Sequence, residues 1–463
     1  MNPQKPLNTR KVLMVAYVFP PIAYAGTYRT LRFCRYLPQN GWIPHVLTIK
    51  EADDLDNDYG LLDRISKEVR IYRTRTIDFW RFWRSQKKET KTSSEIDGGK
   101  QEANKNIRRN RNCSEKVKSF LWKLVTTPDH MVFWIPFAVL KGIWILHKEK
   151  CDLIYTSSPP HSEQIIGYIL SKIFRKPWVA DFRDPWVDAD DFDELTSHSN
   201  LISNIHRFLE RLVVKNATKI SMISPTYTDH LITRYRNIEH SKFITLVNGY
   251  DSNYKPAKPN NSYKKFTIVH AGTFYSNRKP DLFFLGLRSW LESIDASIRK
   301  TVQVFFVGKS HIEISEKIKS YGLQDIIRCL PLMPQKEVVM MMMASHLLLL
   351  VTGLDEKSKG VLTSKLFDYL SIGKPILAIV PEGDAAKIVR ECGAGYVVSE
   401  EDPSMIAKHL QLVFGAYANG GDPGVKFNQQ VIESYDSKTI TERLANTFNA
   451  CLERPRANEQ FRD

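Results

Sequence analysis

Short apolar segments that alternate with amphipathic segments are the feature that most restricts how this chain can fold. The segment from Lys11 to Val18 has the length and composition of a buried strand, residues Thr27 to Pro38 have helical periodicity, and the segment His45 to Ile49 is apolar again. Strands that alternate with helices form parallel sheets with helices on both faces. The sequence therefore predicts an α/β fold of the doubly wound type.

The alternation runs in two series on either side of a polar linker, residues 250–265, which follows Asn248-Gly249. Further strands of the first series are expected at the segments DLIYTSSPP, PWVADFRDPW and 219–223, and those of the second at KFTIVHAGTFY, TVQVFFVG, HLLLLV and ILAIV. At 463 residues the chain is too long for one compact core, and it suits two domains of about 200 residues each. We therefore predict two Rossmann-like domains.

The charge balance indicates an anionic partner. The chain has 66 Lys and Arg against 51 Asp and Glu, a net charge of +15, which fits nucleic acid, membrane headgroups or phosphorylated substrates. Its six cysteines show no CxxC pairing, which argues for a reducing compartment and against structural zinc. Pro20 and Pro21 stop the first apolar run, so it predicts a strand rather than a signal peptide. No uninterrupted apolar run approaches the ~18 residues of a membrane span, and we expect a cytoplasmic protein.

A polar stretch from Gln86 to Cys113 lacks apolar periodicity and predicts a disordered insertion. Around it, the segments FWRFWR, FLWKL and MVFWIPFAVLKGIWILHK interleave aromatic residues with Lys and Arg. This composition suits an anionic membrane interface, where rings lie at headgroup depth and cations meet phosphate. A packed helix with a solvated basic face fits the same residues, and the composition favours neither.

Lys365 occupies an unusual position for a lysine. Thr363 and Ser364 open an apolar-periodic segment that Gly373 and Pro375 close, which predicts a short helix with Lys365 in its first turn. There the ammonium opposes the helix dipole unless an anion lies between them. A phosphate would supply that anion, although a solvated surface lysine explains the same position.

Taken together, the motifs PPIAYAG, SPPHS, DFRDPW, LVNGYD, HAGTFY and KLFDYLSIGKP resemble those of the bacterial members of glycosyltransferase family 4, retaining GT-B enzymes that build polysaccharides of the cell envelope. The resemblance covers the chain except for about Gln86 to Cys113. It implies GT-B architecture, in which two Rossmann-like domains face each other across a cleft and a C-terminal helix returns to the N-terminal domain. The expected boundaries are 1–250 for the acceptor domain, 251–424 for the donor domain and 425–463 for the returning helix.

The resemblance also implies a site for the diphosphate of a sugar nucleotide. Its expected donor-binding residues are Gly272, Thr273, Lys279, Thr363, Ser364 and Asp368, while Arg278 and Lys365 are expected to stabilise the leaving-group charge. The family usually has a glutamate eight residues before the position of Asp368, but this chain has Gly360 there. Asp355 or Glu356 is the candidate replacement.

On the acceptor side, the resemblance assigns His161 the polarisation of a sugar hydroxyl, although a structural helix-cap histidine fits equally, and it lets Asp184 orient the acceptor. Other residues expected at the acceptor cleft are Gly26, Arg29, Asp181 and Arg183; an internal Asp-Arg pair is the alternative for DFRDPW. The acidic run DADDFDE has the DxD spacing of a Mg²⁺ site, but the GT-B resemblance needs no metal, and no cofactor is expected.

These expectations define a retaining, metal-independent hexosyltransferase that uses a UDP- or GDP-linked sugar. Its acceptor would be a hydroxyl of a lipid-linked or polysaccharide glycan, reached from the cytoplasmic face of the plasma membrane. A nucleotide-sugar epimerase on the same fold is the enzymatic alternative. A basic membrane or nucleic-acid adaptor is less favoured, because no nucleic-acid recognition motif is present, so nucleic acid is not an expected partner. A dehydrogenase is disfavoured because no GxGxxG follows a predicted strand.

Overall fold

The computed structural model describes residues 9–50, 57–77, 120–189, 192–196, 199–254, 259, 262–274, 279–308, 312–421 and 423–453. Arg278 and the predicted insertion from Gln86 to Cys113 lie outside this part of the chain. The chain forms two compact units. The first comprises residues up to Met222, 237–244 and those from Ala445 onward, and the second comprises 223–236 and 245–444. The domain boundaries proposed at residues 250 and 424 stay predictions.

A seven-stranded sheet forms the centre of the first unit, in the order β3-β2-β1-β4-β5-β6-β7. Its strands are β1 (Arg10–Val15), β2 (Trp42–Ile49), β3 (Arg70–Thr74), β4 (Leu153–Ser158), β5 (Trp178–Phe182), β6 (Lys219–Met222) and β7 (Phe243–Thr245). From β3 to β6 every neighbouring pair is parallel. The chain order reverses between β1 and β4, the kind of position where ligands bind in doubly wound sheets.

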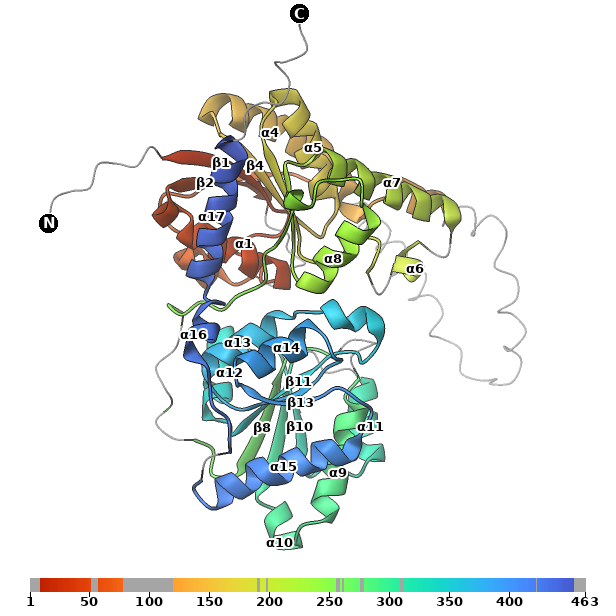
Figure 1. The fold of residues 1–463 in the computed structure, drawn as a ribbon, viewed down its shortest axis with the longest axis vertical. Helices are drawn as coiled ribbons and strands as arrows, with labels where there is room; N and C mark the ends of the chain where they lie inside the picture. The colour runs from red at the N-terminus through yellow and green to blue at the C-terminus, as the bar shows by residue number, and fades with distance from the viewer. Residues whose placement is uncertain are drawn as a thin grey trace, which may run out of the picture. The chain divides into compact units, whose positions relative to one another are not determined.

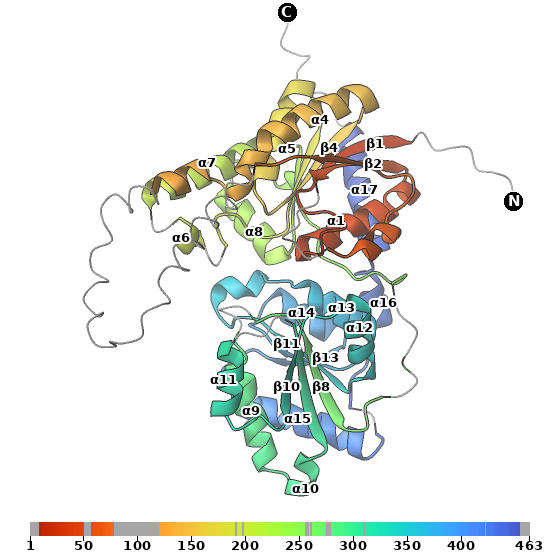
Figure 2. The same ribbon diagram turned by 180° about the vertical axis from the view of Figure 1, so that it is seen from behind.

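Helices cover both faces of this sheet (Figures 1 and 2). One face carries α4 (Ile135–Glu149), α5 (Ser162–Phe174) and α7 (Asn200–Asn216), and the other carries α1 (Ala25–Tyr36) and the last part of α17 (Ser437–Glu453). Phe448 of α17 packs edge-on against Trp42 at 5.2 Å, and the Asn449 side chain accepts hydrogen bonds from Arg10 and Trp42. The C-terminal helix therefore returns to the first unit, as expected.

The second unit has a six-stranded, wholly parallel sheet in the order β10-β9-β8-β11-β12-β13. Its strands are β8 (Phe266–Ala271), β9 (Val302–Val307), β10 (Ile327–Leu330), β11 (Leu347–Val351), β12 (Ile376–Ile379) and β13 (Gly395–Val398). The chain order reverses between β8 and β11. This is the second position at which a doubly wound sheet opens a place for a ligand.

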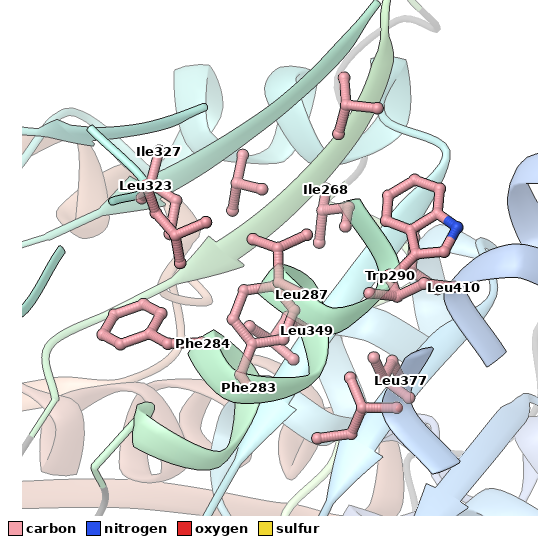
Figure 3. Close-up of a cluster of buried hydrophobic side chains, with 14 of the residues drawn as sticks. Ile268, Phe283, Phe284, Leu287, Trp290, Leu323, Ile327, Leu349, Leu377 and Leu410 are labelled. Atoms are coloured by element: carbon pink, nitrogen blue, oxygen red, sulfur yellow. The ribbon is translucent and has the colours of Figure 1, made fainter. Parts of the chain in front are cut away.

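Strand residues of the second unit alternate between two apolar cores, because successive side chains point to opposite faces. Ile268 and Leu349 join the core under α9 (Asp281–Glu292), α11 (Ile312–Ser320) and α15 (Pro403–Ala418), part of which Figure 3 shows. Val269 and Leu348 face the other core, under α12 (Gln335–Ala344), α13 (Ser364–Ile372) and α14 (Asp384–Glu391). Burial on both faces explains why β11 is apolar throughout.

The remaining described elements are short or join the main ones. They are the helices α6 (Phe192–Leu195), α8 (Pro225–Arg234), α10 (Ala296–Arg299) and α16 (Gln429–Glu433), and the 3-10 turns η1 (Pro38–Asn40), η2 (Tyr59–Arg64), η4 (His130–Trp134), η5 (His240–Lys242) and η6 (Glu356–Gly360). Among the described residues, the stretch His130–Glu149 is the one helical segment whose length and composition would allow it to cross a membrane. The sequence suggested no such segment, because Lys141 divides the apolar run. Ala138, Gly142, Ile145 and Leu146 of this stretch are buried within the first unit.

Candidate functional site

The loop after β8 and the first turn of α13 meet at the carboxyl ends of β8 and β11. Gly272 has φ +120°, and a Cβ atom there would lie 2.6 Å from Nζ of Lys365. Two features therefore require glycine at this position: the backbone conformation, and the lysine side chain that occupies the space of a Cβ atom. The two residues that the sequence assigned to one phosphate site are in contact in the second unit.

His270, the penultimate residue of β8, fixes the ammonium group of Lys365. The Lys365 Nζ atom lies 3.3 Å from His270 Nε2, and His270 Nδ1 lies 2.9 Å from the carbonyl oxygen of Leu349. An ammonium can only donate and a carbonyl can only accept. His270 is therefore a neutral tautomer that accepts at Nε2 and donates from Nδ1. Burial, helped by the nearby Lys365 charge, holds the pKa of His270 well below its usual value.

Tyr369 joins α13 to the same strand ends. Its hydroxyl accepts a hydrogen bond from the Ala271 amide at 2.9 Å and donates to the Leu349 carbonyl at 3.2 Å. His270 also stacks on Phe274, with ring centroids 4.2 Å apart. Lys365 and Tyr369 are four residues apart, so both project from the same side of α13. The orientation of Lys365 is thus fixed by a buried network that the sequence motif alone did not reveal.

The amino end of α13 suits an anion. Thr363 occupies the N-cap position, but its side chain makes no capping hydrogen bond, and its Oγ1 atom is buried without a hydrogen-bond partner among the described residues. Thr363 therefore opens the helix, as the sequence predicted, but its side chain does not cap it. Gly373 caps the other end with φ +71°, as predicted. First-turn amides and the positive end of the helix dipole together favour a bound phosphate.

The other predicted donor residues differ in their surroundings. Thr273, Ser364 and Asp368 are half-buried, with Ser364 and Asp368 both on α13, and Lys279 is exposed just before α9. Arg278 is not among the described residues, so its role in the leaving-group site stays a prediction.

Gly360 stands where the family pattern has a glutamate, and the structure gives a reason. A Cβ atom at Gly360 would lie 2.6 Å from the ring of Tyr227 on α8, whose hydroxyl donates to the Lys357 carbonyl at 3.2 Å. The Glu356 side chain is 85% exposed and pairs with Lys359 at 2.7 Å, and Asp355 caps η6 by accepting from the Ser358 amide at 2.9 Å. Both candidate replacement carboxylates are thus engaged within η6.

In the first unit, Asp181 and Arg29 form a buried, two-pronged ion pair with distances of 2.9 and 2.8 Å. Asp181 also accepts from Tyr155 and Ser157 at 2.8 and 2.9 Å, and from Ser221. Although burial opposes it, the Arg29 charge and these donors keep the pKa of Asp181 below its usual value. Both side chains are internal and brace strand ends, so the pair is structural in this unit, and a place for the two residues at the acceptor cleft stays a prediction.

Gly26 and Arg183 do come together. A Cβ atom at Gly26 would lie 2.6 Å from Cζ of Arg183, and the Arg183 guanidinium donates to the Pro159 carbonyl. Arg183, directly after β5, thus contacts the first turn of α1 and the loop that follows β4. Asp184 is exposed beside it. These three residues remain the predicted acceptor-facing groups of the first unit.

His161 is buried and its ring stacks flat on Trp186, with centroids 4.3 Å apart. Its Nδ1 atom lies 3.3 Å from the Ser158 hydroxyl, and burial lowers the pKa of His161 to about 3. The ring is therefore neutral at physiological pH. His161 occupies the N-cap position of α5, but its side chain makes no capping hydrogen bond; the Asp129 carboxylate instead accepts from the Ser162 amide at 2.8 Å. His161 therefore has the position of a helix-cap residue without the capping hydrogen bond, and its role toward a sugar hydroxyl stays a prediction.

Glu163 is a buried group that the sequence did not single out. Its carboxyl accepts from the Tyr17 amide at 2.8 Å and lies 3.4 Å from the Ser157 amide, so it links the segments after β1 and within β4. Burial raises the pKa of Glu163 to about 8. No sequence signal marks it, because an acidic residue in the first turn of a helix is ordinary.

Comparisons with known proteins identify the fold. No protein-family model matches the sequence, and no curated protein matches it. Among solved structures, a glycosyltransferase from Rickettsia africae is similar with a TM-score of 0.60 and 14% identity, over 97% of this chain and 100% of that one. HepE from Anabaena, solved with UDP and glucose, also has a TM-score of 0.60 and 14% identity, over 95% and 100%. TarM from S. aureus, solved as a mutant with UDP, has 0.58 and 10%, over 95% and 100%.

The chain thus has the fold of the GT-B glycosyltransferases, with two doubly wound parallel sheets. This confirms the predicted fold class. The similarity extends over both units. Within the described residues, no group of three His, Cys, Asp or Glu side chains is arranged to hold a metal ion.

Proposed function

We propose that this protein is a glycosyltransferase that moves a sugar from a nucleotide diphosphate donor to a hydroxyl group. One observation carries the proposal. Lys365, fixed by His270 across Gly272, lies beside the open amino end of α13 at the β8-β11 switch point. A fixed ammonium and helix amides together match a diphosphate. HepE and TarM, which share the fold, were solved with UDP, so UDP is the favoured base and GDP the second.

In this proposal Lys365 and the first-turn amides of α13 stabilise the charge that develops on the leaving diphosphate, and Arg278 adds a second cation. Charges fixed before the reaction lower its barrier without the cost of reorganisation. Because the site supplies its own positive charge, we propose transfer without a metal or cofactor. Retention of configuration and a lipid-linked or polysaccharide acceptor follow from the family resemblance and belong to the same proposal, as does a cytoplasmic location.

Nucleotide binding tests the donor site directly. A thermal-shift screen of the purified chain with UDP, GDP and ADP should show stabilisation by one base, since a ligand at 100 times its Kd adds about 2.7 kcal/mol. Lys365→Ala should weaken that binding at least about ten-fold, because a charge-assisted contact is lost. Lys387→Ala, at an exposed lysine of α14, should leave it unchanged. Stabilisation by no nucleotide, or equal affinity in Lys365→Ala, would refute the site.

Product analysis tests the reaction class. The chain should release UDP or GDP from the matching sugar nucleotide when a glycan acceptor is present, and the sugar should appear on the acceptor. An epimerised sugar that remains on the nucleotide would instead establish the epimerase alternative. These two outcomes are separated by chromatography and NMR of the nucleotide-sugar fraction.

A further inference from the structure

The three helices α4, α5 and α7 form one continuous layer on a single face of the first sheet. α4 packs on α5, which packs in turn on α7. The approach of α4 to α5 is close, because a Cβ atom at Gly142 would lie 2.6 Å from Cδ1 of Leu170. Figure 2 shows α4 and α5 in front of the strands, with α7 beside them. The outward side of this layer, here called the helix face, is a surface of the first unit alone.

Large apolar side chains are exposed on all three helices of the helix face. They are Leu140 and Trp144 on α4, Ile173 on α5, and Leu201 and Phe208 on α7, with exposed fractions of 69, 41, 53, 52 and 63%. Single exposed apolar residues are normal, but a gathering of them marks an interaction surface. The sequence had suggested this for α4, and the fold adds α5 and α7 to the same surface.

The charges on the helix face have one sign. Six cations belong to its helices: Lys141, Lys148, Lys172, Arg207, Arg211 and Lys215. These three helices are described from end to end, and their acidic residues are Glu149, Glu163 and Glu210. Glu163 and Glu210 are buried, and Glu149 has a side chain only 14% exposed, 3.7 Å from Lys11. The helix face therefore presents cations without exposed carboxylates to balance them.

Trp144 links the apolar and charged groups. The Lys141 and Lys148 ammonium groups lie 3.6 and 4.7 Å from the centre of its ring system. A ring with cations at its side matches the headgroup region of a bilayer, where aromatic rings lie at the depth of the carbonyls and lysines reach phosphate. Exposed Leu and Ile side chains make no favourable contact with the phosphate backbone of a nucleic acid. They are stabilised when they are buried at the boundary between the lipid headgroups and the acyl chains.

We propose that the helix face docks this protein on an anionic lipid bilayer. The apolar side chains enter the headgroup boundary and the six cations meet lipid phosphates. α4 lies in the plane of the membrane surface, since Ala138, Gly142, Ile145 and Leu146 hold it within the first unit. This proposal goes beyond sugar transfer, and it does not depend on nucleotide binding.

Vesicle flotation with the full chain tests the proposal. The protein should bind phosphatidylcholine vesicles that contain phosphatidylglycerol, bind pure phosphatidylcholine vesicles at least about ten-fold less, and lose binding as salt rises. Leu140→Ser/Trp144→Ser and Lys141→Gln/Lys148→Gln should each lower the partition coefficient roughly ten-fold or more, because Leu140, Trp144 and Lys148 are exposed and the half-buried Lys141 lies against Trp144. Matched changes in the second unit, Leu285→Ser and Lys319→Gln/Lys408→Gln, alter exposed residues and should have no effect.

Three outcomes of this experiment would contradict the proposal. Unchanged binding in both helix-face variants would overturn the proposal, as would equal binding to the two kinds of vesicle. Tighter binding to random RNA than to anionic vesicles, lost in the same variants, would assign the helix face to nucleic acid instead. Far-UV circular dichroism and the melting temperature of each variant establish that the fold is intact.

Discussion

The Nζ atom of Lys365 lies 3.3 Å from Nε2 of His270, although 95 residues separate them in the sequence. The contact turns a flexible lysine into a cation with a fixed direction at the amino end of α13. A buried, neutral histidine is suited to this role, since it accepts a hydrogen bond without adding a competing charge. His270 is thus a positioning residue for the proposed diphosphate site.

His270→Phe should weaken UDP binding about ten-fold, because it keeps the stack on Phe274 but removes the acceptor for Lys365. His270→Gln restores an acceptor and should recover most of the affinity. Isothermal titration calorimetry of a double-mutant cycle provides the check. If His270 acts through Lys365, then His270→Phe causes no further loss in a Lys365→Ala background. A loss of the same size in both backgrounds would show that His270 acts independently.

Gly272→Ala should displace Lys365, because the added methyl group would overlap its side chain, and the backbone there has φ +120°. We expect UDP affinity to fall about as far as in Lys365→Ala, with a loss of stability of about 1 to 3 kcal/mol. Gly322→Ala is the matched control: that residue has φ +70° but nothing within 4 Å of the added atom. It should lose a similar amount of stability and keep its UDP affinity; comparable losses of affinity in both variants would contradict this explanation.

Glu163 should make stability fall as pH rises. Its folded pKa of about 8 lies above the ordinary value of 4.5, so the folded state binds more protons between these values. The stabilising contribution is complete below pH 4.5 and declines through this window by up to about 1.4 kcal/mol per pH unit. Glu163→Gln keeps an acceptor for the Tyr17 amide and should raise the melting temperature above pH 8 but not at pH 4.5. Glu316→Gln, at an exposed residue of α11, should show no such dependence, and a constant difference for Glu163→Gln would refute the assignment.

Arg29→Ala should destabilise the first unit by about 3 to 5 kcal/mol, because it leaves the Asp181 carboxylate buried without its cation. Asp181→Asn should cost less, since the amide removes the charge and keeps one oxygen acceptor for its neighbours. Thermal unfolding, followed together with UDP binding, would measure both effects. UDP affinity of the folded fraction should not change, because the pair lies in the first unit; a large loss of affinity would indicate that the pair contributes to the donor site.

Some helices and strands of this fold could be predicted from the sequence, and others could not. The segments that predicted β1, α1, β2 and α13 match the structure within a few residues, because local periodicity marks them. The edge strands β3 and β13 were missed. β3 contains two arginines among its five residues and has no buried residue, and β13 has only four residues, so neither has the apolar run of a central strand. The helix α15 was missed as well, although its buried residues join the core of the second unit.

The sequence by itself determined the doubly wound class, the short α13 helix and the exceptional place of Lys365 in its first turn. These features depend on the spacing of residues along the chain, because helix and strand periodicity and the helix dipole act between residues that are close in sequence. The tertiary structure alone decided that His270 holds Lys365, that Arg29 neutralises Asp181 and that the Tyr227 ring fills the space beside Gly360. Those contacts join residues 95 to 152 positions apart in the first two cases. No local pattern encodes such pairs, since they form only when parallel strands bring their carboxyl ends to one edge.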